Sequence, residues 1–273
     1  MKISQKYEDF CVLNGIPFQN GLSIGSYDDT TLFCPAGMQQ FKSKFKSPNG
    51  STIGNIQPCL RLNDFDQIGD GTHFLYFNMM GLFSFKDKSV QWTIDFWLDF
   101  LNSINVVPDY FTIHPDKKDW IKYYPNCDVR LDSECIWSDG DIGGYCTEFY
   151  KNGIEIGNIV NPLGESIDVG FGLERLEIFH GLTRSKEDIL RESVIKIVNS
   201  GYRPGNLKQG YVLRKLLREC FRNNITIDHE FYHDEVKRQE KIVQRYNKLK
   251  DRNLDKSPEW WYDTHGIDLS LLD

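Results

Sequence analysis

The glycine-rich stretch at residues 167–176 is the part of the chain whose residue types are best suited to chemistry. Gly170 and Gly172 lie two residues apart, and a helical segment with Glu174 and Arg175 follows them directly. Because glycine has no Cβ, the backbone here can approach a flat ligand, while Arg175 and the helix start supply positive charge for a phosphate. Taken alone, the pattern favours a simpler interpretation, a tight strand-to-helix turn whose glycines serve packing.

Hydrophobic periodicity predicts the elements that would position this stretch. An amphipathic helix is expected at residues 3–11 and ends before Gly15. The aromatic run at 73–85 predicts a buried strand, or two strands kinked at Gly81. Further segments complete the prediction: a turn and short strand within 28–38, helices at 90–104, 188–198, 210–223 and 234–250, a strand at 110–114, and an irregular or short helical excursion at 115–125. Residues 137–150 are expected to be a Gly/Asp-rich loop that enters a strand, which forms a hairpin with a second strand at 154–160.

Length and composition indicate a globular protein with an ample core. A chain of 273 residues can form one large domain with a small appendage, and no apolar run is long enough to cross a membrane, so we expect a cytoplasmic protein. The seven cysteines are scattered and include no C-x-x-C pair. This argues against a disulfide framework and a structural zinc knuckle, and it predicts that most of the cysteines are buried thiols.

The charge of the chain is distributed unevenly. Residues 201–273 carry 14 Lys and Arg against 12 Asp and Glu, whereas residues 1–200 carry 18 against 27. The last quarter of the chain is therefore the better place for an anionic macromolecule to dock. A solvated helical surface is the alternative for any single Lys or Arg there.

Several short motifs occur in an order that is itself informative. They are residues 31–42, Cys59-Leu60-Arg61, Asn63-Asp64, residues 77–85, Trp137, Gly140-Asp141, Cys146-Thr147-Glu148, residues 155–160, residues 168–175, residues 210–214 and residues 262–266. Taken in this order, the series resembles the class II aminoacyl-tRNA synthetases, and within them the catalytic region of alanyl-tRNA synthetases. Each motif is weak by itself, but the ordered set extends over nearly the whole chain.

The resemblance implies an α+β fold, an antiparallel sheet flanked by helices, followed by a small helical region. Residues 1–182 would be the adenylating domain, and residues 183–273 would resemble the part that binds the tRNA acceptor stem. The implied reaction activates an amino acid with ATP and Mg²⁺ to give an aminoacyl-adenylate and pyrophosphate. Catalysis of that step is mainly positioning and charge neutralisation.

The resemblance also implies roles for individual residues. At the ATP site, Arg61 would hold the α-phosphate and the substrate carboxylate, Asp64 the adenine amino group, and His73 would lie near the triphosphate, while Phe77 and Arg175 would sandwich the adenine beside Gly170 and Gly172. At the amino-acid site, Asp168 would pair with the ammonium group with help from Asn158, Met79, Trp137 and Val160 would form walls, and Glu148 would serve the metal or the amine. Asn206, Arg214, Arg218 and Arg222 would contact tRNA.

Departures from the family pattern leave alternatives open. The family has an Arg where this chain has Thr72, which removes a cation near the triphosphate, and it has a Trp where this chain has Gly157. It also has an aromatic residue where this chain has Asn161 and a Pro-Cys-Gly-Pro-Cys turn where this chain has Gly143-Gly144-Tyr145-Cys146. Together these changes suggest an amino-acid pocket with an added cavity and polar group, and a substrate other than alanine. The family's editing domain and its zinc site are expected to be missing. The alternatives are an adenylating paralogue that serves a carrier protein, a metabolite or a polysaccharide, and a non-catalytic tRNA-binding paralogue; the oligomeric state stays open.

Overall fold

The chain divides into two compact units, Met1–Arg184 and Ser185–Asp273. The computed structural model describes residues 1–27, 30–253, 255–265, 267 and 269. Asp28 and Asp29 of the expected turn, and Gly266 of the last motif, lie outside the described residues. Each unit is therefore described by itself.

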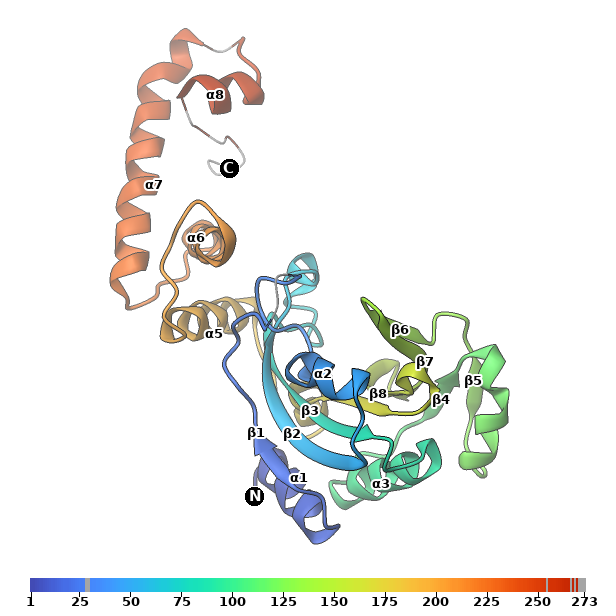
Figure 1. Cartoon of the computed structure of the whole chain (residues 1–273). Helices are drawn as coiled ribbons and strands as arrows, with labels where there is room; N and C mark the ends of the chain where they lie inside the picture. The colour runs from blue at the N-terminus through green and yellow to red at the C-terminus, as the bar shows by residue number, and fades with distance from the viewer. Residues whose placement is uncertain (28–29, 254, 266, 268, 270–273) are drawn as a thin grey trace. The chain divides into compact units, whose positions relative to one another are not determined.

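A nine-stranded sheet forms the centre of the first unit (Figure 1). Its strands are β1 (Phe18–Asn20), β2 (Ser51–Leu60), β3 (Tyr76–Phe85), β4 (Tyr110–Ile113), β5 (Val129–Leu131), β6 (Ile136–Asp139), β7 (Ile142–Lys151), β8 (Ile154–Val160) and β9 (Ile167–Gly172). The strand order is β1-β2-β3-β9-β8-β7-β4-β5, and β6 pairs with β7. Only the β1–β2 and β4–β5 pairs are parallel. The predicted α+β fold with a largely antiparallel sheet is confirmed.

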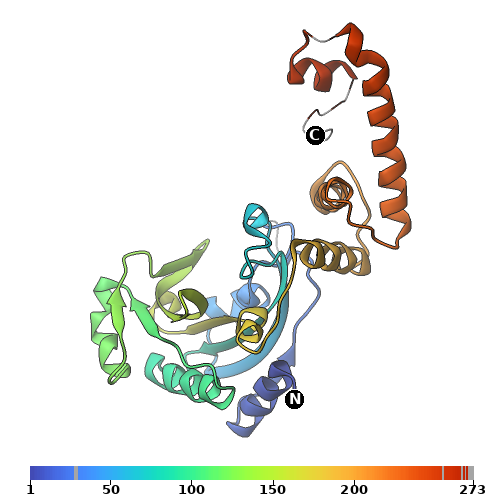
Figure 2. The same ribbon diagram turned by 180° about the vertical axis from the view of Figure 1, so that it is seen from behind.

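Helices lie on both sides of this sheet. They are α1 (Ile3–Leu13), α2 (Lys42–Lys46), α3 (Val90–Ser103) and α4 (Leu173–Ile178), with short 3₁₀ segments η1 (Gly37–Phe41), η2 (Phe65–Gln67), η3 (Pro115–Tyr123) and η4 (Pro162–Gly164). Figures 1 and 2 show α1 and α3 along one side of the curved sheet, with α2 on the other. The sheet therefore has an outer face covered by α1 and α3 and an inner face that carries α2.

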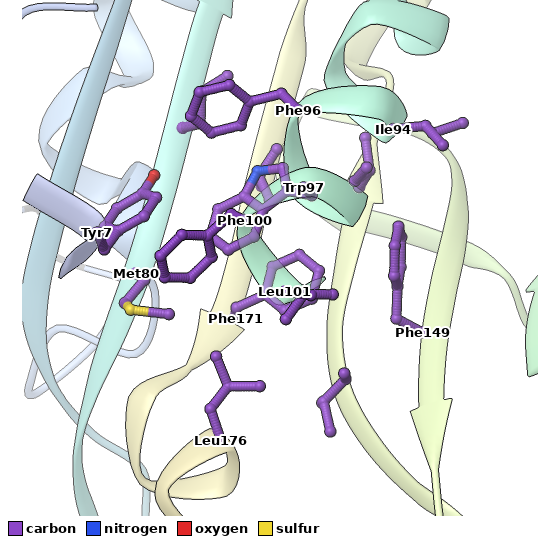
Figure 3. Close-up of a cluster of buried hydrophobic side chains, with 14 of the residues drawn as sticks. Tyr7, Met80, Ile94, Phe96, Trp97, Phe100, Leu101, Phe149, Phe171 and Leu176 are labelled. Carbon is purple, nitrogen blue, oxygen red and sulfur yellow. The ribbon is translucent and has the colours of Figure 1, made fainter. Parts of the chain in front are cut away.

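The main apolar core fills the outer face (Figure 3). Trp97 of α3 stacks on Phe171 of β9 with ring centroids 4.0 Å apart, and Tyr7 of α1 stacks on Trp97 at 5.0 Å. The Tyr7 hydroxyl donates a 2.7 Å hydrogen bond to the carbonyl of Gly81, which satisfies the one polar atom that this ring brings into the core. Burial of these large rings ties both helices to the centre of the sheet.

The first of the two alternatives for the run at 73–85 is confirmed, whereas the strand expected within residues 28–38 needs correction. The run at 73–85 forms one strand that continues through Gly81, since both neighbours, β2 and β9, pair along it. The short strand expected within residues 28–38 is wrong in its described part, where only an isolated bridge joins Gly25 to Phe33. Pro35 lies just after this bridge and has no backbone N–H to donate, so the pairing is not extended into a ladder.

The second unit is helical. It contains α5 (Lys186–Asn199), α6 (Lys208–Arg222), α7 (Glu230–Leu249), η5 (Lys250–Arg252) and α8 (Pro258–His265). A capping box of Ser185 and Asp188 starts α5, and Leu213, Leu216 and Leu217 bury the apolar face of α6. Within the described residues, no helix combines the length and the apolar character that a membrane span needs.

Candidate active site

A pocket of about 770 Å³, including its open mouth, lies on the inner face of the sheet in the first unit. It is lined by residues of β3, β6, β8, β9 and α4 and of the connections before and after β2: Ala36, Arg61, Asp64, Thr72, Phe74, Phe77, Met79, Trp137, Glu155, Ile156, Gly157, Asn158, Val160, Asp168, Gly170, Gly172, Glu174 and Arg175. The structure thus brings together all but two of the residues expected at the ATP and amino-acid sites.

Arg61 enters this pocket directly after the end of β2. Its backbone N–H donates to the Leu75 carbonyl, and its Nε donates to the Pro35 carbonyl at 2.8 Å. The guanidinium group lies 5.2 Å from the centre of the Phe77 ring. In the part of the chain that the structure describes, no carboxylate lies within ion-pair distance of Arg61. The arginine is therefore oriented by neutral groups and keeps its charge available for an anion.

Asp168 is the opposite case, a carboxylate at the floor of the pocket. It is only 8% exposed, and its β9 position faces Phe83 of β3 and Val160 of β8 across the ladder. Burial, together with the negative charge of Asp139, raises the pKa of Asp168 to about 7. Among the described residues, none donates a hydrogen bond or an ion pair to this carboxylate. Such a group is well suited to pair with a cationic ligand.

The two glycines of β9 bring the backbone of the pocket close to its neighbours. A Cβ at Gly170 would lie 2.9 Å from the sulfur of Met79, and one at Gly172 would lie 3.5 Å from the side chain of Arg175. Asn158 stands opposite Gly170 on β8. Side chains at both glycine positions would fill space that the pocket uses, so the glycines serve the cavity as well as the strand.

Arg175, at the start of α4, is held by three contacts. Its Nη1 donates to the Glu155 carbonyl at 2.8 Å and lies 3.5 Å from the Glu155 carboxylate, and its Nε donates to the Thr72 carbonyl at 3.4 Å. Burial raises the pKa of Glu155, whereas the charge of Arg175 lowers it. Glu155 is a pocket residue to which the sequence pattern assigned no individual role.

His73 is one of the two expected site residues that do not line the pocket. Its Nδ1 lies 2.5 Å from Asp70, and both it and Thr72 donate backbone N–H bonds to the same carboxylate. Burial raises the pKa of the Asp70 carboxyl, but the hydrogen bonds from Thr72 and His73 outweigh this effect and lower the pKa to about 2. His73 therefore helps to close the turn before β3, and Thr72 takes its place at the pocket wall.

Glu148 is the other expected residue outside the pocket lining. It lies on β7, opposite Asn158. Its Oε2 accepts hydrogen bonds from the Thr112 hydroxyl at 3.0 Å and from the Tyr150 hydroxyl at 2.8 Å. One strand therefore separates this carboxylate from the pocket.

Glu174 is a pocket residue that the sequence did not single out for a role. It is 9% exposed, and it accepts 2.8 Å bonds from both the backbone and the side-chain nitrogen of Asn78. Burial raises its pKa to about 7 although the two Asn78 bonds oppose this rise. The sequence signal for this role was an acidic residue among the apolar residues at the start of α4. It was overlooked because the neighbouring Arg175 was the residue considered for ligand binding.

The departure at Gly157 has a different meaning from the expected one. A Cβ at this position would lie 2.3 Å from the Phe171 ring and 2.7 Å from the Gly170 carbonyl. Phe171 belongs to the core on the outer face, where it stacks on Trp97. The space next to Gly157 is therefore filled by core, so this glycine does not add a cavity to the pocket as the sequence suggested.

In the helical unit, the three expected arginines of α6 have partners of their own. Arg214 donates to the side chain of Asn206, and it lies 3.9 Å from Glu235, a buried carboxylate of α7. Arg218 donates to the Arg214 carbonyl, and Arg222 pairs with Glu219 at 3.2 Å. A groove along α7 carries a denser set of basic side chains, Lys237, Arg238, Lys241, Arg245 and His265, beside Asp234 and Ile242.

Comparison with known proteins shows that the chain is similar in sequence to part of several alanine–tRNA ligases. The alanine–tRNA ligase of Tropheryma whipplei (strain Twist) is 27% identical in a gapped alignment 291 positions long, which covers 78% of this chain and 33% of that protein. The enzyme of that name from Chlamydia trachomatis serovar L2 is 30% identical in a gapped alignment 278 positions long, which covers 71% of this chain and 32% of its own. This chain spans about a third of the length of the curated relatives it matches.

A solved pyrrolysyl-tRNA synthetase from Desulfitobacterium hafniense aligns with 69% of this chain and 72% of its own at a TM-score of 0.45 and 13% identity. The model of the family "tRNA synthetases class II (A)" matches residues 3–142, which include α1, the strands β1 to β6, Arg61, Phe77 and Trp137. With half of its length matched by that model, the chain belongs to the class II tRNA synthetases.

Proposed function

We propose that the first unit activates an amino acid with ATP and forms an aminoacyl-adenylate. One observation carries the proposal: a buried carboxylate without a cationic partner, Asp168, and an arginine without a carboxylate partner, Arg61, line the same pocket of the described structure. An α-amino acid is a zwitterion, so its ammonium group and its carboxylate complement these two residues. The family of the chain supports the same assignment.

The chemical step needs few groups of the protein. A carboxylate oxygen of the amino acid attacks the α-phosphorus of ATP, the bond from that phosphorus to the bridging oxygen breaks, and pyrophosphate leaves with the electron pair. Arg61 neutralises charge at the α-phosphate and aligns the attacking carboxylate, while Asp168 fixes the amino acid through its ammonium group. These contributions are orientation and charge stabilisation, which require no general base.

The rest of the pocket suits a purine nucleotide. Phe77 and Arg175 provide an aromatic face and a guanidinium plane for the adenine, and the bare backbone at Gly170 and Gly172 leaves room for the ring. Asp64 lines the same pocket and can accept from the adenine amino group. Mg²⁺ bound with ATP supplies neutralisation of phosphate charge, and Glu155 is the pocket carboxylate that we assign to it.

Amino-acid-dependent exchange of pyrophosphate into ATP tests this function across the twenty amino acids. We expect exchange with at least one of them and a loss of about 100-fold or more for Arg175→Ala, because the change removes one wall of the adenine site. Arg222→Ala, an exposed arginine of the second unit, is the matched control and should exchange at the wild-type rate. No exchange with any amino acid by a folded protein would contradict the proposal.

For the acceptor we propose tRNA, bound by the second unit. The support is the cationic groove of α7, in which Lys241 and Arg245 add to the positive balance of this part of the chain. Lys241 and Arg245 have no carboxylate within ion-pair distance among the described residues. Arg214 and Arg222 of α6, by contrast, lie beside Glu235 and Glu219, so the groove is a better tRNA contact than the face of α6. Charging of bulk tRNA with the activated amino acid tests this step. Exchange without charging would instead favour a carrier protein or a small acceptor.

A further inference from the structure

A second polar cluster lies on the inner face of the sheet, outside the pocket. It consists of Cys135, Cys146 and Glu148, whose sulfur and carboxylate oxygen atoms all lie within 4.8 Å of one another. Cys135 immediately precedes β6, and Cys146 and Glu148 point the same way from β7 because they are two residues apart on one strand. The backbone N–H of Cys146 donates to the Cys135 carbonyl at 3.0 Å, which fixes the two cysteines side by side.

The surroundings of this cluster orient its possible ligand atoms. Glu148 uses its Oε2 to accept from Thr112 and Tyr150, and its Oε1 lies 4.0 Å from the sulfur of Cys146. The Thr112 hydroxyl also lies 2.9 Å from the sulfur of Cys135. One carboxylate oxygen is thus anchored by two hydroxyls while the other faces the sulfurs. Outer contacts of this kind fix the ligands of metal sites in proteins.

We propose that Cys135, Cys146 and Glu148 bind a zinc ion. Two thiolates and one carboxylate suit Zn²⁺ in charge and softness, and three protein ligands leave a fourth position for water or another ligand. Both cysteines are buried, whereas Glu148 is partly exposed and provides the way in. Closing the cluster from 4.8 Å to the spacing of a zinc tetrahedron needs side-chain movements of about 1 Å.

The position of the cluster beside the pocket indicates a structural role for the ion. Cys146 stands opposite Val160 and Glu148 opposite Asn158, and both partners line the pocket. Trp137, another wall of the pocket, follows Cys135 by two residues on β6. An ion that joins β6 to β7 would therefore hold this side of the pocket in place. The site itself does not depend on amino-acid activation.

Cobalt substitution tests the site on the whole chain, kept reduced and free of chelators. Co²⁺ should bind with the near-ultraviolet thiolate-to-metal absorption of a two-cysteine site, and Zn²⁺ should displace it. Cys146→Ser should weaken binding by about 100-fold or more, and Thr112→Val, which removes an outer contact, by about 10-fold. Cys220→Ser, a buried cysteine of the second unit, is the matched control and should bind like the wild type.

The site would be overturned by the absence of thiolate absorption in the reduced wild type, or by an unchanged cobalt spectrum in Cys146→Ser. Where Cys146→Ser fails to fold, Glu148→Gln replaces it, and loss of affinity with both cysteines intact then supports the site while wild-type affinity overturns it. A Cys135–Cys146 disulfide that still forms when zinc is in excess also counts against it. Because no readout uses ATP or an amino acid, failure here is distinguishable from failure of the proposed activity.

Discussion

The two faces of the central sheet differ in whether they hold charged groups without a partner of opposite charge. On the outer face, Trp97, Phe171 and Tyr7 stack on one another and the Tyr7 hydroxyl has its acceptor, so the one buried polar atom there without a partner among the described residues is the uncharged Trp97 Nε1. On the inner face, the described structure leaves Asp168 without a cation and Arg61 without a carboxylate. Both faces are carried by the same strands, so the difference lies in side chains and not in architecture. It indicates that the outer face stabilises the unit while the inner face is prepared for a ligand.

The largest effect is expected from the outer face. Trp97→Ala removes a fully buried ring that contacts both α1 and β9 and should lower the free energy of unfolding by about 3–5 kcal/mol. Leu13→Ala on α1, where the side chain is 84% exposed, is the control and should change it by less than about 0.5 kcal/mol. Denaturant titration measures both. If Trp97→Ala lowers the free energy of unfolding by less than about 1 kcal/mol, the outer face does not stabilise the unit as we infer.

The second prediction is that Asp168→Asn stabilises the folded protein at pH 8 but abolishes its activity. Folding raises the pKa of Asp168 from 3.8 to about 7, so the folded wild type holds this proton more tightly than the unfolded chain. Its stability therefore falls as the pH rises from about 4 to 7 and then stays low. The asparagine carries no charge, so at pH 8 the variant should be more stable by up to about 4 kcal/mol. Pyrophosphate exchange should be lost, since the substrate ammonium has no counter-charge.

The pH dependence supplies the control for that prediction. Near pH 4 the wild-type Asp168 is protonated in the folded protein, and the two proteins should have similar stability. Thermal unfolding at pH 4, 6 and 8 would show whether the gap opens as the pH rises. An equal gap at all three values would mean that the asparagine acts through packing and not through charge.

The sequence predicted which residues line the inner face better than it predicted the polar contacts between them. Glycine spacing and the ordered motifs were enough to expect Arg61, Phe77, Asp168 and Arg175 in one site, and the structure places all four in the pocket. The partners of these residues could not be inferred, because they come from distant strands. Glu155 meets Arg175 only through the β8–β9 pairing.

Three-dimensional neighbours also explain what the sequence missed. The side chain absent at Gly157 was expected to open the pocket, but alternation along β8 directs that position to the core, where Phe171 fills the space. Cys135 and Cys146 escaped notice as a pair, since a spacing of eleven residues has no meaning until β6 folds back on β7. Arg214 looked like a surface cation, although α7 brings the buried Glu235 against it.

The smallest effect is expected from Glu174→Gln, which compares the two buried carboxylates of the pocket. The pKa of Glu174 is also raised to about 7, so removing its charge at pH 8 would by itself stabilise the folded state as at Asp168. However, Glu174 accepts from two nitrogens of Asn78, and glutamine can accept only one of these bonds while its amide N–H₂ faces the other donor. The two contributions oppose each other, so the free energy of unfolding should change by only about 1 kcal/mol. Because Asp168 has no such donors among the described residues, its substitution lacks this offset. Equal gains for both variants in denaturant titrations at pH 8 would show that burial alone, and not the absence of a partner, sets Asp168 apart.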